Sequence, residues 1–165
     1  MSLSKYTKEN MKRKIVIFDL DGTLALIEKR RAFKAHEGGK INWKEFFNPK
    51  NISMDEPNVP VIHMFNTLKK EGHMMVVFSG RDSVTRQATE KWLDKHGIAP
   101  DILVMRPKGS YTPDNELKRG WLYDLLEATD SDKGDILCIF DDRDQVVNMW
   151  REEGLTCFQV APGSF

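Results

Sequence analysis

The stretch KIVIFDLDGT, residues 14–23, decides how this chain folds. Its first half is apolar and β-branched, which predicts a short buried strand. Asp19 and Asp21 follow where that strand ends, and Gly22 lets the chain turn so that both carboxylates face one crevice. Two carboxylates this close repel each other, and a divalent cation is the usual means of offsetting the repulsion. An Asp-Gly turn alone is an ordinary loop feature, but the whole string after a buried strand favours a functional site.

Strands and helices alternate along the rest of the chain. Apolar runs predict strands at 74–78, 102–105, 136–140 and 156–160, and the helical spacing of apolar residues predicts helices at 59–70, 83–96, 115–128 and 146–153. This alternation predicts the α/β class, with a Rossmann-like, mostly parallel sheet and helices on both of its faces. Ligands of such sheets bind beyond the carboxyl ends of the strands, so the polar residues found there are candidates for a site.

Residues 24–56 interrupt this alternation. They contain no clear strand, and they carry two adjacent glycines and several aromatic residues. A segment this long between core elements is usually functional or disordered, and the aromatic residues argue against disorder. We therefore expect one domain over residues 1–165, with a small helical cap insertion at about 24–56 over the site.

The composition suits a single small domain. The 165 residues are 40% hydrophobic, with 25 basic and 25 acidic side chains. That is too little apolar material for a membrane protein, and the zero net charge indicates no broad nucleic-acid surface, although an enzyme that grips one chain end needs only a local patch. Cys138 and Cys157 lie in apolar runs without metal-site spacing, which predicts reduced core residues and a cytosolic protein. Residues 1–14 hold no apolar run of signal-peptide length.

A second candidate motif follows the strand at 74–78. The hydroxyl of Ser79 and the backbone N–H groups around Gly80 suit a phosphate oxygen, because a strand-to-helix junction presents free donors. Arg81 can add a bidentate clamp. A common loop remains the alternative interpretation of these three residues when they are taken alone.

Two further acidic motifs complete the candidates. Asp141 and Asp142 are adjacent at the end of the strand at 136–140, where charge is costly unless it is paired or bound to metal. We expect one metal ligand and one supporting acid, the alternative being a helix N-cap role for one of them. Asp114 and Lys118 are four residues apart and share a helix face, although a surface pair is the default for that spacing.

The order of these four motifs resembles that of the haloacid dehalogenase superfamily. A closer likeness, at 139–151 and 159–165, is to the 3′-phosphatase domains of phage polynucleotide kinase/phosphatases. Ser79 to Arg81, the pair Asp114 and Lys118, and Arg30 also fall at matching places. No Gly-x-x-x-x-Gly-Lys-Ser/Thr loop occurs, so the kinase half is absent from this sequence. Between residues 23 and 57 only Arg30 matches, which leaves the choice of substrate open.

The resemblance implies a Mg²⁺-dependent phosphatase. Asp19 would attack phosphorus to form an aspartyl-phosphate, and Asp21 would protonate the leaving oxygen and then activate water. For that, the pKa of Asp21 should lie above the free value of about 3.9. Mg²⁺ would be held by Asp19, the backbone carbonyl of Asp21 and Asp142, with Asp141 in support.

The resemblance also assigns the phosphate-binding residues. Lys118 would act in catalysis by gripping the phosphate oxygens with Ser79, and Asp114 would orient Lys118. Thr23 and Gly80 belong to the same phosphate-binding set. Arg81 and Arg30 would bind the substrate phosphate or neighbouring groups.

The expected substrate is a 3′-phosphate at a DNA or RNA end, with a separate kinase or ligase as partner and a phage-encoded protein in the host cytoplasm as setting. The alternatives are a phosphatase of free nucleotides or sugar phosphates, a non-catalytic partner subunit of a nucleic-acid repair enzyme, and a dehalogenase, which has less need of the Asp141 and Asp142 pair. Trp43 and Tyr111 lie in predicted loops near the site, where base stacking is open to them. For Trp43 we expect core packing.

Overall fold

The computed structural model describes residues 13–33 and 39–165. Its centre is a five-stranded sheet in the order β5-β4-β1-β6-β7, and every pair of neighbours in it is parallel. The strands are β1 (Ile15–Asp19), β4 (Met74–Asp82), β5 (Ile102–Arg106), β6 (Ile136–Asp141) and β7 (Cys157–Gln159). All five residues of β1 are buried, because this strand has neighbours on both edges and helices over both faces.

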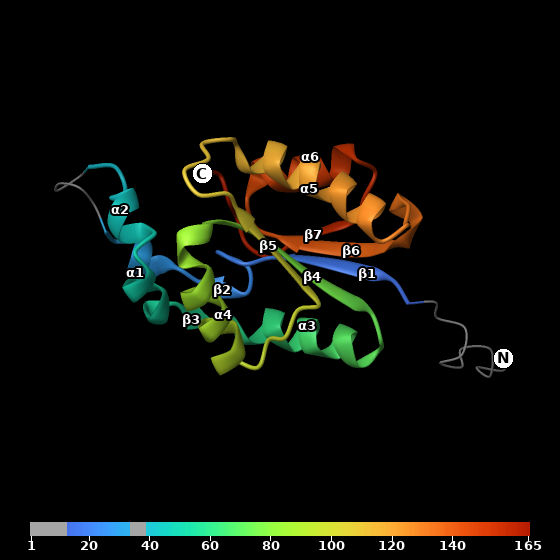
Figure 1. The fold of residues 1–165 in the computed structure, drawn as a ribbon, viewed down its shortest axis with the longest axis horizontal. Helices are drawn as coiled ribbons and strands as arrows, with labels where there is room; N and C mark the ends of the chain where they lie inside the picture. Colours follow the sequence, from blue (N-terminus) through green and yellow to red (C-terminus); the bar gives the residue numbers. More distant parts are fainter. Residues whose placement is uncertain (1–12, 34–38) are drawn as a thin grey trace.

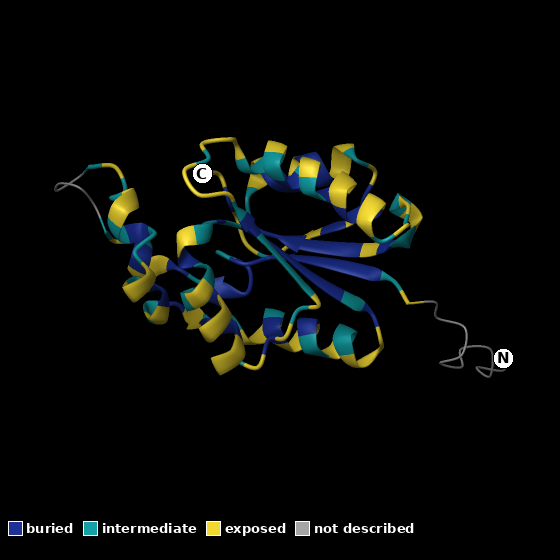
Figure 2. Ribbon diagram, in the orientation of Figure 1, coloured by how far each residue is buried: buried dark blue, intermediate teal, exposed yellow. Residues whose placement is uncertain are grey.

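Helices cover the two faces of the sheet (Figure 1). One face carries α3 (Val59–Lys70) and α4 (Arg86–Lys95), and the other carries α5 (Asp114–Ala128) and α6 (Asp144–Glu152). Successive side chains of a strand point to opposite faces, so Val16 and Phe18 join one apolar core while Ile17 joins the other. Figure 2 shows the strands as the buried layer between these helices. The predicted fold class is confirmed.

The predicted element boundaries differ from the structure mainly near residue 80. Strand β4 continues to Asp82, and a 3-10 turn, η3 (Ser83–Thr85), precedes α4. The side chain of Asp82 accepts a hydrogen bond from the backbone N–H of Val84, which caps this turn. Another 3-10 turn of the same length, η4 (Lys133–Asp135), leads into β6. The two cysteines are buried and free, as expected.

The segment between β1 and α3 forms the cap. It contains α1 (Glu28–Arg31), α2 (Trp43–Phe46) and a 3-10 helix, η2 (Pro49–Met54), while residues 34–38 lie outside the described part of the chain. The expectation that it holds no strand was wrong, because β2 (Ala25–Leu26) and β3 (Glu56–Pro57) pair antiparallel at its base. Strands of two residues are too short to show an alternating pattern in a sequence.

Across the described residues, no helix combines the length and the apolar character that crossing a membrane requires.

Candidate active site

Asp19 lies at the carboxyl end of the central strand, and both of its carboxylate oxygens accept hydrogen bonds. The Nζ of Lys118, from α5, donates to its Oδ1 at 2.7 Å, and the hydroxyl of Thr23 donates to its Oδ2 at 3.1 Å. Lys118 also donates to Oδ2 of Asp141 at 2.8 Å. Thr23 is fully buried beneath Asp19. Its hydroxyl therefore orients the Asp19 carboxylate, in place of the expected contact with phosphate.

Three buried carboxylates meet at this point. Asp19, Asp141 and Asp142 each offer an oxygen atom, and the three atoms lie within 4.8 Å of one another. Burial raises the pKa of Asp19 well above its ordinary value, with Asp141 and Asp142 adding to the effect and Lys118 opposing it. Burial and the charge of Asp141 raise the pKa of Asp142 to about 6. A hard divalent cation fits this set of oxygen donors, because one ammonium group cannot balance three carboxylates.

Asp21 lies in a separate network of charges. Its Oδ1 accepts hydrogen bonds from Nη2 of Arg30, in the cap, and from Nε of Arg81, which follows Ser79 on β4, each at 2.8 Å. Both arginines also bind Asp55, at the end of η2: Arg30 donates through Nε at 2.6 Å and Arg81 through Nη2 at 2.7 Å. Two guanidinium groups and two carboxylates therefore balance one another between the cap and the sheet.

This network changes the roles expected of the two arginines. Neither Arg30 nor Arg81 has any exposed surface, and neither lines the cavity described below. Their donors are turned toward Asp21 and Asp55, not toward a substrate. The expectation that they bind the substrate phosphate is therefore corrected: the structure places them behind Asp21, where they position it.

The pKa expected of Asp21 was also wrong in direction. Burial raises the pKa of its carboxyl, but the charges of Arg81 and Arg30 and their hydrogen bonds outweigh burial, so the pKa lies below its ordinary value. A sequence shows the two acids of a motif but not the cations that the fold brings to one of them. Arg81 lies 60 residues from Asp21 along the chain.

Asp114 does not hold Lys118 by a hydrogen bond, in contrast to what was expected. Its Oδ1 accepts from Arg106 and its Oδ2 from Nη1 of Arg143, the latter at 2.8 Å. Asp19 and Asp141 hold Lys118 instead. The carboxylate of Asp114 thus links the end of β5 to the loop after β6.

Ser79 and Gly80 lie at the end of β4, beside Asp114. Ser79 is buried, and its hydroxyl accepts a hydrogen bond from the backbone N–H of Arg81 at 3.2 Å. The carbonyl of Gly80 accepts from Nε of Arg106 at 2.9 Å, and Gly80 itself lines the cavity. The expectation that these residues follow the strand was wrong, because both lie inside β4, and only Gly80 of the two reaches the cavity.

Three residues of this region were not expected from the sequence. Arg106 ends β5, so its place at the carboxyl end of a strand could have pointed to it, and Arg143 directly follows the acid pair. Asp55 had no such signal, because it is a single acid at the end of the cap segment.

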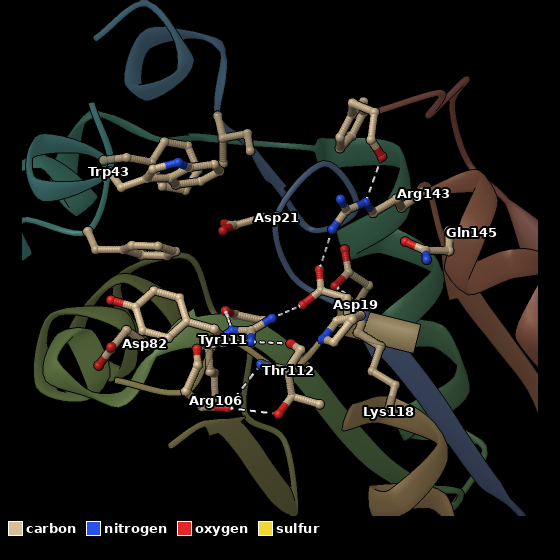
Figure 3. Close-up of a pocket in the computed structure, with 18 of the residues that line it drawn as sticks. Asp19, Asp21, Trp43, Asp82, Arg106, Tyr111, Thr112, Lys118, Arg143 and Gln145 are labelled. Atoms are coloured by element: carbon tan, nitrogen blue, oxygen red, sulfur yellow. Dashed lines mark hydrogen bonds and ion pairs between the residues drawn. The ribbon is translucent and has the colours of Figure 1, made fainter. Parts of the chain in front are cut away.

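A cavity of about 890 Å³ opens above Asp19 (Figure 3). Asp19, Asp21 and Lys118 line it together with Asp141 and Asp142. The cap contributes aromatic side chains to one wall, and the loop after β5 contributes Arg106 and residues 109–113 to another. The reaction centre is therefore reached through a cavity with an aromatic wall.

Trp43 and Tyr111 line this cavity and are strongly exposed, at 57% and 98% of their surface. The expectation of core packing for Trp43 was therefore wrong. The short helix α2 turns Phe46 into the core and leaves Trp43 facing outward.

The fold and the acids at the strand ends define the class of protein. A haloacid dehalogenase-like hydrolase from Streptococcus pneumoniae superposes with a TM-score of 0.65, at 15% identity, over 89% of this chain and 84% of its own. At that identity the likeness shows the shared fold.

Sequence comparison then places the chain within this class. The family described as the polynucleotide kinase PNKP phosphatase domain matches residues 13–165, and the chain belongs to this family. A putative bifunctional polynucleotide kinase/RNA ligase of Autographa californica nuclear polyhedrosis virus is 30% identical over 139 residues, which are 83% of this chain and 18% of that protein. A chain of the Pnkp1/Rnl/Hen1 complex is 33% identical with a TM-score of 0.76, over 93% of this chain and 47% of that one. The chain thus spans less than half the length of either relative.

Proposed function

We propose that this phosphatase domain removes 3′-phosphates from nucleic-acid ends, with Mg²⁺ and through an aspartyl-phosphate. The observation that carries the proposal is Asp19 itself: a buried carboxylate fixed by Lys118 at the base of an open cavity whose walls are aromatic and cationic. The family supports a polynucleotide substrate. Since the relatives are described as a kinase/ligase and as part of a Pnkp1/Rnl/Hen1 complex, we propose that the domain works with kinase and ligase activities in the cytoplasm.

In the first half of the reaction, an oxygen of Asp19 attacks phosphorus and the bond from phosphorus to the 3′ oxygen breaks. Asp21 delivers the proton that the leaving oxygen needs. Asp21 is an anion in the resting protein, because Arg81 and Arg30 lower its pKa. The negative charge of a bound phosphate beside it would raise that pKa, since like charges disfavour ionisation, so the proton is taken up as substrate binds.

In the second half, water attacks the phosphorus of the aspartyl-phosphate. Asp21 removes a proton from this water, the bond between Asp19 and phosphorus breaks, and inorganic phosphate leaves with the carboxylate of Asp19 restored. A carboxylate held by two guanidinium groups is pre-aligned for this proton transfer. The network that positions Asp21 therefore serves the hydrolytic half directly.

The negative charge of the phosphoryl group would be stabilised mainly by cations. The ammonium of Lys118 lies against Asp19 and would face the transferring group, and Gly80 lines the same cavity, with Ser79 buried directly before it in β4. Asp19, Asp142 and the backbone carbonyl of Asp21 would hold Mg²⁺, with Asp141 in support. When bound, the ion supplies positive charge that stabilises the transferring phosphoryl group.

The test is phosphate release from a 3′-phosphorylated oligonucleotide, compared with a 5′-phosphorylated one and with free nucleotides, in Mg²⁺ and in chelator. Fast, Mg²⁺-dependent release from the 3′ end is the expected result. Equal or faster release from free nucleotides would keep the phosphatase chemistry and assign the domain to small-molecule metabolism. Undiminished release in chelator would remove the metal from the proposal.

A further inference from the structure

We propose that Trp43 forms a nucleobase-stacking subsite, on which the terminal base of the polynucleotide rests while its 3′-phosphate lies at Asp19. This inference rests on the proposed function, which it deepens by naming the part of the substrate that the cap recognises.

The ring of Trp43 is held in place from below but open toward the cavity. It stacks on Phe47, with ring centroids 5.8 Å apart and planes inclined by 19°, and it meets Phe46 edge-on at 5.4 Å. Phe46 itself is buried in the core. Even so, 57% of the Trp43 side chain is exposed. Covering an exposed indole releases ordered water. A ring that its neighbours already hold in place loses little conformational freedom when a ligand covers it, so this surface is favourable for binding.

The opposite wall of the cavity offers a second ring. Tyr111 extends from the loop between β5 and α5, almost fully exposed, and lines the same cavity. Figure 3 shows Trp43 on the cap and Tyr111 on this loop, on the same side of Asp19. A flat, aromatic ligand part that enters beside the phosphoryl group would therefore pass between two aromatic side chains.

The charges around the cavity agree with a nucleotide as the occupant. Arg31, Arg106 and Arg143 line it together with Trp43. The guanidinium of Arg31 lies 3.6 Å from the ring centroid of Phe165 and so is held at the rim by a cation–π contact. Cationic groups suit the phosphates of a nucleic-acid strand, and aromatic faces suit its bases. Arg106 and Arg143 share the carboxylate of Asp114, so an apolar peptide would cover the rings but bring no anion to Arg31.

The two aromatic walls also belong to the cavity that holds the catalytic residues. Asp19 and Lys118 line the same continuous cavity as Trp43 and Tyr111. We assign the base on Trp43 to the nucleotide that carries the phosphate under attack, because both groups would occupy this one cavity. Stacking tolerates all four bases, because each presents a π-face, so the subsite would select for a base and not for a sequence.

The experiment compares two 3′-phosphorylated oligonucleotides that differ only at the last residue, which is an ordinary nucleotide in one and an abasic sugar in the other. Trp43→Ala should lower kcat/KM on the ordinary end by about tenfold and by less than about twofold on the abasic end. Trp43→Phe keeps a ring and should keep most of the activity on both. Tyr123→Ala, at an exposed aromatic residue that does not line the cavity, is the matched control.

Equal losses on the two substrates with Trp43→Ala would show a structural role and overturn the proposal, as would no loss on either. Failure of the proposed function looks different, because the unmodified protein would then show no preference for 3′-phosphorylated ends.

Fluorescence gives a second readout that needs no turnover. Trp92 and Trp150 are buried and Trp121 is half-buried against the core, so Trp43 is the strongly exposed indole of the described chain. A 3′-hydroxyl oligonucleotide should quench the emission of the unmodified protein and of Tyr123→Ala, and the quench should vanish with Trp43→Phe. A quench that survives Trp43→Phe would place the base elsewhere.

Discussion

The two oxygens of Asp19 have different neighbours, and this matters for catalysis. Lys118 faces one of them and the hydroxyl of Thr23 the other. The carboxylate is thereby held in one orientation before substrate arrives, which lowers the entropy lost on reaching the geometry of attack. Lys118 pairs with both Asp19 and Asp141, so it is also the cation that keeps the acid cluster together.

Replacement of the nucleophile tests this arrangement first. Asp19→Asn should lower phosphate release by more than about a thousandfold, because an amide cannot form the acyl-phosphate. The fold should survive, since the amide oxygen still accepts a hydrogen bond from Lys118. Phosphate release and thermal unfolding would be measured on the same preparation. A variant that retains most of its turnover would exclude the covalent mechanism.

Replacement of Asp55 tests whether the position of Asp21 depends on the arginines that both carboxylates bind. Asp55→Asn leaves two buried guanidinium groups with one carboxylate fewer, and we expect a loss of about 3 kcal/mol in the free energy of unfolding. The fall in activity should appear mainly in kcat, because Asp55 does not line the cavity but holds the arginines that align Asp21.

The neighbouring residue supplies the control. Glu56 is exposed and pairs with exposed Lys29, so Glu56→Gln should leave both the stability and kcat almost unchanged, because solvent screens this pair. If Asp55→Asn raised KM alone, or behaved like Glu56→Gln, its role in positioning Asp21 would be refuted.

At the scale of elements, the turn after β1 sets the position of the acid cluster. Gly22 has φ +82°, a conformation that L side chains rarely adopt. A Cβ at this position would lie 2.0 Å from Oδ2 of Asp142. The turn that follows the nucleophile thus packs directly on the acid supplied by β6, and only glycine leaves room for it.

Two glycine substitutions separate backbone strain from this close approach. Gly72 has φ +93° with no atom within 4 Å of a Cβ, so Gly72→Ala should cost only about 1–2 kcal/mol of stability. Gly22→Ala should carry the same strain and also displace Asp142, raising the Mg²⁺ concentration for half-maximal activity at least about tenfold. The measurement is a Mg²⁺ titration of activity. An unchanged titration with Gly22→Ala would show that Asp142 does not hold the ion.

At the scale of the whole molecule, the acid cluster links stability to pH and to metal. Without metal, the pKa values of Asp19 and Asp142 are raised, to about 6 for Asp142 against an ordinary 3.8. Between these two values the folded protein binds more protons than the unfolded chain, so its stability falls as pH rises through that window. Asp21, with its lowered pKa, acts in the opposite sense, but only in more acidic solution.

Thermal unfolding with and without Mg²⁺ measures this linkage. In chelator the protein should be more stable at pH 5 than at pH 7.5. Mg²⁺ should raise the unfolding temperature clearly at pH 7.5 and little at pH 5, because the ion and the protons compete for the same carboxylates. An equal effect of Mg²⁺ at both pH values would place the ion away from Asp19 and Asp142.

The cap is the part of the molecule whose structure was predicted least well from the sequence. The stem β2–β3 consists of two pairs of residues, and such short strands have no periodicity. Trp43 was expected in the core, but the four-residue helix α2 buries only Phe46 fully. The sheet and its helices were predicted closely, because all of them except the short edge strand β7 carry five or more residues with a regular apolar pattern.

By itself, the sequence determined the layered α/β fold and the acids that end its strands. Both follow from local order: apolar periodicity sets each element, and parallel strands bring their carboxyl ends to one edge. The tertiary structure alone decided which cation meets which acid. Lys118 forms ion pairs with Asp19 and Asp141, while Arg30 and Arg81 form ion pairs with Asp21 and Asp55. Pairings over 60 or 99 residues depend on how helices and cap pack against the sheet, and no local pattern encodes that packing.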